Sequence, residues 1–193
     1  MNFRKVKFIT SAVASDGWPE DNLPEVVMIG KSNVGKSTLI NLLVGQKIAK
    51  VSSTPGHTKT LNFFEIDQKL RLVDAPGHGF ASRSKNVASS FNVMMSEYLS
   101  KREKLKAAII LLDGRREISE DDQVLYQLIL ENELKVLLVI TKSDKLNQSI
   151  KAKIVKEVNE KFPNYNQKEI IYTAVNKPQS IVNLQAKIIG VSK

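Results

Sequence analysis

The chain has 193 residues and a formal net charge of +9, with 42% hydrophobic and 25% charged residues. These values are ordinary for one soluble globular domain, and a chain of this length buries a core without covalent staples. There is no cysteine, and the only histidines are His57 and His78, which excludes disulfides, thiol catalysis, thiolate metal sites and histidine-rich metal sites. The positive charge favours a polyanionic partner, with simple solubility as the alternative.

The N-terminal residues are predicted to form an extension over residues 1–22, ahead of one domain over residues 23–193. Basic residues precede the stretch Phe8–Ser11 and small residues follow it, but the stretch is too short and too polar for the core of a signal peptide. No run of eighteen apolar residues occurs in the chain. We therefore expect a cytoplasmic protein without a membrane partner, whose extension could add an edge element to the fold.

Apolar runs and helical stripes alternate along the rest of the chain. The predicted strands cover residues 26–29, 61–66, 70–73, 107–112, 136–140 and 170–172. The predicted helices cover residues 38–44, 87–98, 119–129, 150–162 and 181–188, and Ser119 with Asp122 is typical of a capping box. This order predicts an α/β fold with a mixed, mainly parallel sheet covered on both faces, in which the 61–73 hairpin supplies one antiparallel edge strand.

The segment after the first of these strands matches the phosphate-binding pattern G-x-x-x-x-G-K-[ST]. It consists of Gly30, Lys31, Ser32, Asn33, Val34, Gly35, Lys36 and Ser37, and we count Thr38, which follows it, with the same nucleotide-binding segment. Backbone N–H groups in such a loop point at phosphate oxygens, and the helix N-terminus adds positive potential. The pattern predicts that Lys36 contacts the β- and γ-phosphates and that Ser37 gives its hydroxyl to Mg²⁺.

Asp74 and Gly77 form the pattern D-x-x-G after the strand 70–73. An aspartate at a strand end can reach Mg²⁺ through water, and Gly77 can offer its N–H to the γ-phosphate because it has no side chain. Alone, this pattern is more often a turn. Its spacing after the phosphate-binding loop favours the nucleotide role.

Two further segments follow the last two strands and indicate which base is bound. Thr141, Lys142, Ser143 and Asp144 have the T-K-x-D pattern, in which the Asp144 carboxylate would accept the N1–H and 2-amino donors of guanine while the stem of Lys142 lies along the base. A capped helix start is the alternative for this tetrapeptide alone. By position only, we expect Thr173, Ala174 and Val175 to present a backbone N–H to the guanine O6.

Together, the segments G-K-S-N-V-G-K-S, P-G-H-T-K-T-L-N-F-F, D-A-P-G-H-G-F-A and T-K-S-D resemble the EngB family of bacterial GTPases, from about Leu23 to the last strand. The resemblance implies a Ras-like P-loop fold that binds GTP or GDP with Mg²⁺ and hydrolyses GTP to GDP and phosphate. It also implies a switch in assembly of the large ribosomal subunit. The implied partners of this monomer are the subunit or its precursors and ribosomal RNA.

The resemblance also assigns roles to individual loop residues. Residues 52–60 resemble switch I, in which Thr58, or else Thr60, closes on Mg²⁺ and the γ-phosphate; an ordinary loop hydroxyl is the alternative. Residues 77–86 resemble switch II, where His78 departs from the tyrosine usual in the family. His78 either positions the attacking water or lines the nucleotide mouth.

Asn33 has two interpretations of the same kind. It either holds a K⁺ ion between the phosphates or serves as a turn residue. Because no glutamine of the Ras type adjoins Gly77, we expect slow hydrolysis that a partner or an ion completes.

Two other functions compete with this one. A P-loop kinase for a small acceptor would prefer adenine, and a non-enzymatic RNA-binding module would have lost Lys36, Ser37 or Asp74. The hypothetical contacts to ribosomal RNA are the loop residues Arg83, Lys85, Arg115 and Arg116.

Overall fold

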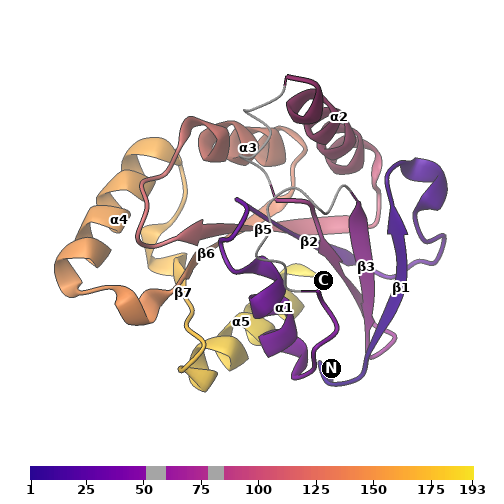
Figure 1. The fold of residues 1–193 in the computed structure, drawn as a ribbon, viewed down its shortest axis with the longest axis horizontal. Coiled ribbons are helices and arrows are strands. Elements are labelled where there is room, and N and C mark those ends of the chain that lie inside the picture. The colour runs from indigo at the N-terminus through magenta and orange to yellow at the C-terminus, as the bar shows by residue number, and fades with distance from the viewer. Residues whose placement is uncertain (51–59, 78–84) are drawn as a thin grey trace.

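A seven-stranded sheet with the strand order β1-β3-β4-β2-β5-β6-β7 forms the centre of the computed structural model, which describes residues 1–50, 60–77 and 85–193 (Figure 1). The strands are β1 Val6–Ala12, β2 Glu25–Gly30, β3 Leu61–Ile66, β4 Leu70–Asp74, β5 Leu105–Asp113, β6 Lys135–Thr141 and β7 Ile171–Tyr172. The helices are α1 Lys36–Val44, α2 Lys85–Lys101, α3 Glu120–Glu131, α4 Gln148–Lys161 and α5 Pro178–Val191.

The sheet is mixed and mainly parallel, as the sequence predicts. Strands β4, β2, β5, β6 and β7 run parallel to one another, whereas β3 is antiparallel to both of its neighbours. The hairpin of β3 and β4 does not supply the edge strand, because β1 pairs along β3 from Val6 opposite Ile66 to Ala12 opposite Leu61. Part of the N-terminal segment therefore belongs to the sheet.

Helices cover both faces of the sheet, and β2 and β4 are buried at every position. Along β2, Val26 and Met28 pack toward α1 and α5, while Val27 and Ile29 pack toward α2, α3 and α4. Figure 1 shows α2 and α3 above the sheet and α1 and α5 below it. Two covered faces explain why the parallel strands are apolar at successive positions rather than at alternate ones.

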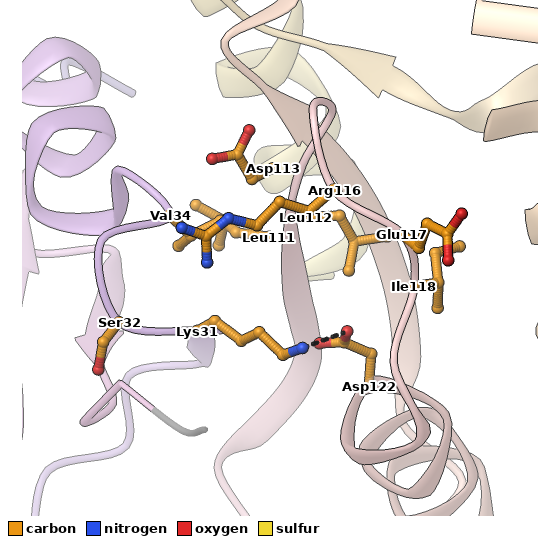
Figure 2. A pocket seen from close by; sticks show the side chains of 10 residues that line it. All are labelled: Lys31, Ser32, Val34, Leu111, Leu112, Asp113, Arg116, Glu117, Ile118 and Asp122. Atoms are coloured by element: carbon orange, nitrogen blue, oxygen red, sulfur yellow. Dashed lines mark ion pairs between the residues drawn. The ribbon is translucent and has the colours of Figure 1, made fainter. Parts of the chain in front are cut away.

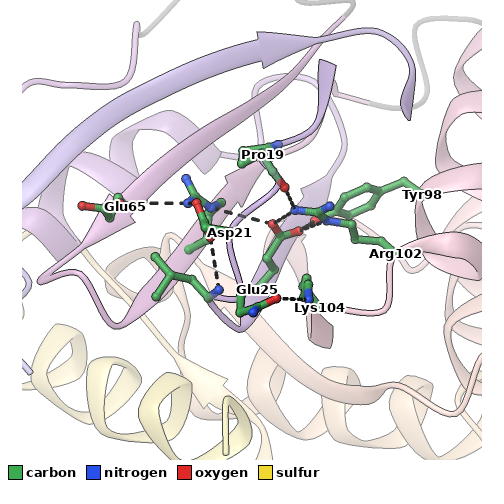
Figure 3. Close-up of polar contacts among 10 residues, drawn as sticks. Pro19, Asp21, Glu25, Glu65, Tyr98, Arg102 and Lys104 are labelled. Atoms are coloured by element: carbon green, nitrogen blue, oxygen red, sulfur yellow. Dashed lines mark hydrogen bonds and ion pairs between the residues drawn. The ribbon is translucent and has the colours of Figure 1, made fainter. Parts of the chain in front are cut away.

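A polar network fastens the amino end of β2 to its surroundings (Figure 3). The fully buried carboxylate of Glu25 accepts hydrogen bonds from the Tyr98 hydroxyl (2.7 Å) and from Nε of Arg102 (2.9 Å). Nε of the fully buried Arg71 lies 3.7 Å from the same carboxylate, and Arg71 also pairs with Asp21. Burial, and then the neighbouring Glu25 charge, raise the pKa of Tyr98 well above its usual value. This network stands at the opposite end of β2 from Gly30.

Helix α3 begins with the predicted capping box. The Ser119 hydroxyl accepts a hydrogen bond from the backbone N–H of Asp122, and the Asp122 carboxylate accepts one from the backbone N–H of Ser119 (2.9 Å). In the three described stretches of chain, no helix has the length and apolar character that crossing a bilayer requires.

Candidate functional site

The phosphate-binding loop connects the end of β2 to the start of α1. Its backbone is left-handed at Asn33 (φ 64°) and at Gly35 (φ 102°), a conformation that glycine adopts freely and asparagine tolerates. Gly30 is required for a different reason. A Cβ atom there would lie 2.9 Å from both the Leu111 carbonyl oxygen and a methyl carbon of Val34. The loop thus folds tightly over the end of β5.

Lys36 and Asp74 meet at the carboxyl ends of β2 and β4. The Lys36 ammonium contacts the Asp74 carboxylate, and both side chains are largely withdrawn from solvent. Burial raises the pKa of Asp74, and the charge of Lys36 partly opposes that rise. Ser37 follows in the first turn of α1 and is half-buried. Two side chains predicted to serve phosphate and metal therefore already lie together.

Gly77 lies against the phosphate-binding loop. A Cβ atom at Gly77 would be 3.0 Å from the backbone nitrogen and Cα of Ser32, which leaves no space for a side chain. The segment that follows β4 therefore starts in direct backbone contact with the loop, where the predicted donation to the γ-phosphate requires it.

The T-K-S-D segment is hydrogen-bonded to the phosphate-binding loop and to the last strand. The Thr141 hydroxyl donates to the Val34 carbonyl (2.8 Å), and the Lys142 ammonium donates to the Asn33 carbonyl (3.0 Å). The backbone N–H of Ser143 donates to the carbonyl of Thr173 (3.0 Å). Three segments far apart in sequence are thus fixed relative to one another.

These segments border one open pocket of about 230 Å³. Its lining comes from α1, the phosphate-binding loop, T-K-S-D and the segment after β7, namely Val34, Gly35, Thr38, Leu39, Leu42, Thr141, Lys142, Asp144, Thr173, Ala174, Val175 and Ile181. The phosphate cradle and the carboxylate predicted to read the base therefore border a single crevice.

Comparison with known proteins assigns the family. Residues 25–142, more than half of the chain, match the family model described as 50S ribosome-binding GTPase. The probable GTP-binding protein EngB of Mesoplasma florum is 46% identical over 160 residues, which cover 82% of this chain and 81% of that protein. Its counterpart from Streptococcus mutans is 40% identical over 186 residues, 92% of this chain and 91% of that protein. The chain belongs to the EngB family of GTP-binding proteins.

Solved structures agree with this family and its fold. A crystal structure of a probable GTP-binding protein EngB superimposes with a TM-score of 0.71 at 25% identity, covering 87% of this chain and 98% of that one. The ribosomal-RNA-bound structure of Era, at 24% identity and a TM-score of 0.64, shares the Ras-like fold over 89% of this chain and 56% of that one. As an EngB-family member the chain is a GTP hydrolase, which sets aside the kinase and the non-enzymatic module.

An EngB GTPase binds GTP and GDP, usually with Mg²⁺, and the donor set of this chain fits that ion. Magnesium keeps much of its shell as water and substrate phosphate and takes only one or two protein ligands. Within the described ranges, no group of three or more acidic or histidine side chains is arranged so that it could hold a metal ion. A hydroxyl from Ser37 and the carboxylate of Asp74, beside a phosphate cradle, are the donors that such an ion needs.

Several predicted residues of this EngB-family site lie outside the described residues. These are Thr58, His78 and Arg83, together with most of both switch segments. Thr60, the second candidate for the switch threonine, is described: its hydroxyl donates to the Asn62 side chain (3.2 Å) just before β3. The roles of these residues stay predictions.

Lys31 is directed away from the nucleotide pocket. Its ammonium lies 3.5 Å from the carboxylate of Asp122, which is 2% exposed at the start of α3 (Figure 2). The side chain therefore connects the phosphate-binding loop to the capping box of α3, and any contact from Lys31 to phosphate comes from its backbone.

Sequence reasoning missed Asp113, the last residue of β5. Its carboxylate, 8% exposed, accepts hydrogen bonds from Lys142 (2.8 Å) and from Nε and Nη2 of Arg115 (3.0 and 2.9 Å). Burial alone would raise the pKa of Asp113, but the hydrogen bonds from Arg115 and Lys142 hold it far below its usual value. A signal was available, because an aspartate at the carboxyl end of a buried parallel strand lies at the edge where ligands bind.

Proposed function

We propose that this EngB-family GTPase is a cytoplasmic switch in assembly of the large ribosomal subunit, binding the subunit or its precursors through ribosomal RNA. The observation that supports an RNA partner is the distribution of charge. Residues 135–193 contain eleven lysines and four acidic residues, so they carry +7 of the +9 of the whole chain. A surface with this charge binds nucleic acid favourably, because its lysines release counter-ions from the phosphate backbone.

Three lysines in this region have no carboxylate partner among the described residues. Lys168, Lys177 and Lys187 are exposed and line an open groove between β7 and α5. Lys153 and Lys156 of α4, by contrast, are paired with acidic side chains. The groove is therefore the part of the basic region best suited to phosphate. Arg115, a candidate from sequence, is occupied by Asp113.

In this proposal the protein speeds hydrolysis by positioning the reacting groups and by neutralising the charge of the phosphates. Backbone N–H groups of the phosphate-binding loop hold the phosphates, and Lys36 leaves Asp74 to place its ammonium between the β- and γ-phosphates. Asp144 accepts the two donors of guanine, and the Gly77 N–H donates to the γ-phosphate. Bound Mg²⁺ would supply positive charge at the phosphate oxygens. The attacking water is held by groups that a partner completes.

Potassium dependence belongs to the same proposal. Asn33 sits at the loop position from which a K⁺ ion could be held between the phosphates, although its left-handed backbone is equally what a turn asparagine adopts. Phosphate release compared in K⁺ and in Na⁺ decides between the two. If the rate is several-fold higher in K⁺ and Asn33→Ala removes this difference, Asn33 holds the ion. If the rates in K⁺ and Na⁺ are equal, Asn33 is a turn residue only.

Co-sedimentation with large ribosomal subunits tests the partner. We expect the GTP-loaded chain to bind more tightly than the GDP-loaded chain. Changing Lys168, Lys177 and Lys187 together to glutamine should lower the slope of log affinity against log salt by about one for each RNA phosphate that the variant no longer neutralises. Changing the acid-paired Lys101, Lys153 and Lys156 to glutamine removes the same charge and is the control. Equal slopes for both triple variants would reject the groove, and no sedimentation in either nucleotide state would reject the partner.

A further inference from the structure

A buried carboxylate at the end of β5 holds the ammonium group that the T-K-S-D segment presents. Oδ2 of Asp113 lies 2.8 Å from Nζ of Lys142, and the same Nζ donates to the Asn33 carbonyl at 3.0 Å. The Lys142 side chain is thereby held at its tip, and the residue lines the nucleotide pocket. Its backbone is left-handed (φ 57°), so the residue is constrained at both ends.

Asp113 is itself held in place from the other side. Arg115 donates to it through Nε (3.0 Å), through Nη2 (2.9 Å) and through its own backbone N–H (3.1 Å). A carboxylate that accepts a forked pair of bonds from arginine has a fixed plane as well as a fixed position. The oxygen that faces Lys142 therefore has little freedom to turn away.

The turn after Asp113 packs directly on the loop that contains the T-K-S-D segment. The Gly114 N–H donates to the carbonyl of Thr141 (3.3 Å), and a Cβ atom at Gly114 would be 2.5 Å from the Leu146 side chain and 2.8 Å from that of Ile140. A larger residue here would have to displace the side chains of Leu146 and Ile140. The carboxylate and the loop that it supports thus share one rigid contact.

We propose that Asp113 is a positioning residue for the base: it fixes the ammonium of Lys142 so that the stem of Lys142 forms a wall of the guanine pocket before nucleotide arrives. The proposal rests on the base contact predicted for Lys142. A lysine side chain free to sample its rotamers would have to be ordered at each binding event. Asp113 removes that cost in advance.

Asp113→Asn keeps the shape of the side chain and removes its charge. Arg115 and Lys142 then share one neutral amide and repel each other, so the stem of Lys142 leaves the wall of the pocket. Because a hydrogen bond between charged groups is removed, we expect GDP to bind roughly tenfold more weakly or worse. The turnover number at saturating GTP should be unchanged while KM rises, because Lys142 does not reach the reacting phosphates.

A double-mutant cycle with Lys142→Met separates positioning from a general role in folding. Methionine keeps an apolar stem and lacks the ammonium, so Asp113 has nothing left to position. We expect Asp113→Asn to weaken GDP binding in the natural chain and to add less than a twofold loss in the Lys142→Met background. Fluorescent GDP titration of the full chain measures all four affinities. The exposed pair of Glu117 and Lys153 is the matched control, and Glu117→Gln should leave GDP affinity unchanged.

Each outcome is decisive. Equal losses from Asp113→Asn in both backgrounds would overturn the positioning role. If Lys142→Met leaves GDP affinity intact, holding the ammonium contributes nothing to base binding and the positioning proposal fails, whereas GTP hydrolysis by the chain stands. Should Asp113→Asn fail to fold, Asp113→Glu replaces it in the same cycle. Its charge is kept but its carboxylate is displaced by one methylene, and the same non-additive result is expected.

Discussion

Lys36 is placed for two contacts that exclude each other. Its ammonium lies against the buried carboxylate of Asp74. With nucleotide it is predicted to hold the β- and γ-phosphates. The incoming phosphates therefore have to draw the ammonium away from Asp74, and that carboxylate becomes available to a cation at the same moment. The ion pair places each of these two buried charges beside one of opposite sign.

Replacing Lys36 tests its predicted role. We expect Lys36→Met to lower the turnover number for GTP by roughly 10²–10³, the usual cost of removing one donor to developing charge. Phosphate release at saturating GTP measures it. Lys69→Met, in the exposed turn between β3 and β4, is the control and should keep the natural rate. If Lys36→Met keeps the turnover number of the natural chain, Lys36 has no catalytic role.

Asp113 also gives stability a dependence on pH. Its pKa in the folded chain lies far below the value of about 3.9 for a free aspartate. A lowered folded pKa stabilises the fold above the unfolded pKa, and that contribution is lost as pH falls through the folded pKa. We therefore expect the difference in unfolding free energy between the natural chain and Asp113→Asn to be largest above about pH 5 and to shrink toward pH 3. Urea unfolding at both values measures it, and a constant difference would contradict it.

Among the secondary-structure elements, α3 depends most clearly on its first residues. Ser119 accepts from the Asp122 N–H and also donates its hydroxyl to the Asp122 carboxylate (2.6 Å). Ser119→Ala should lower the free energy of unfolding by about 1 kcal/mol, because a helix N-terminal donor loses its acceptor. Urea unfolding checks this. Ser100→Ala near the end of α2 should have almost no effect, since its hydroxyl only bonds back to carbonyls of its own helix.

Most elements could be predicted from sequence because buried strands and amphipathic helices leave strong periodic patterns. The hairpin of β3 and β4 is predictable from its short polar turn. The place of β1 is not, since Val6–Ala12 mixes exposed and buried positions and its pairing with β3 is a long-range choice. Asp113 could be noticed at the end of its strand, but its pairing with Lys142 escapes prediction for the same reason. Its partner Lys142 is 29 residues away, and only the parallel pairing of β5 with β6 brings them together.

At the scale of the whole molecule, the network around Glu25 separates stability from activity. It ties β2, β4, α2 and the N-terminal segment together at the end of the sheet opposite the nucleotide pocket (Figure 3). Glu25→Gln leaves the buried Arg71 and Arg102 short of negative charge, which should cost about 3–5 kcal/mol of unfolding free energy. At a temperature low enough for the variant to stay folded, its GDP affinity should equal that of the natural chain. Thermal unfolding and GDP titration measure the two, and a loss of affinity without a loss of stability would contradict this separation.

Because residues 135–193 carry +7 of the net charge of +9, we expect the charge to be distributed unevenly over the molecule. β7 and the adjoining α4 lie at one edge of the sheet, and the nearly neutral remainder extends to β1 at the other. The electric field of a large polyanion would orient the protein before contact, so that its basic edge faces the polyanion. Added salt should therefore lower the association rate constant far more than it raises the dissociation rate constant.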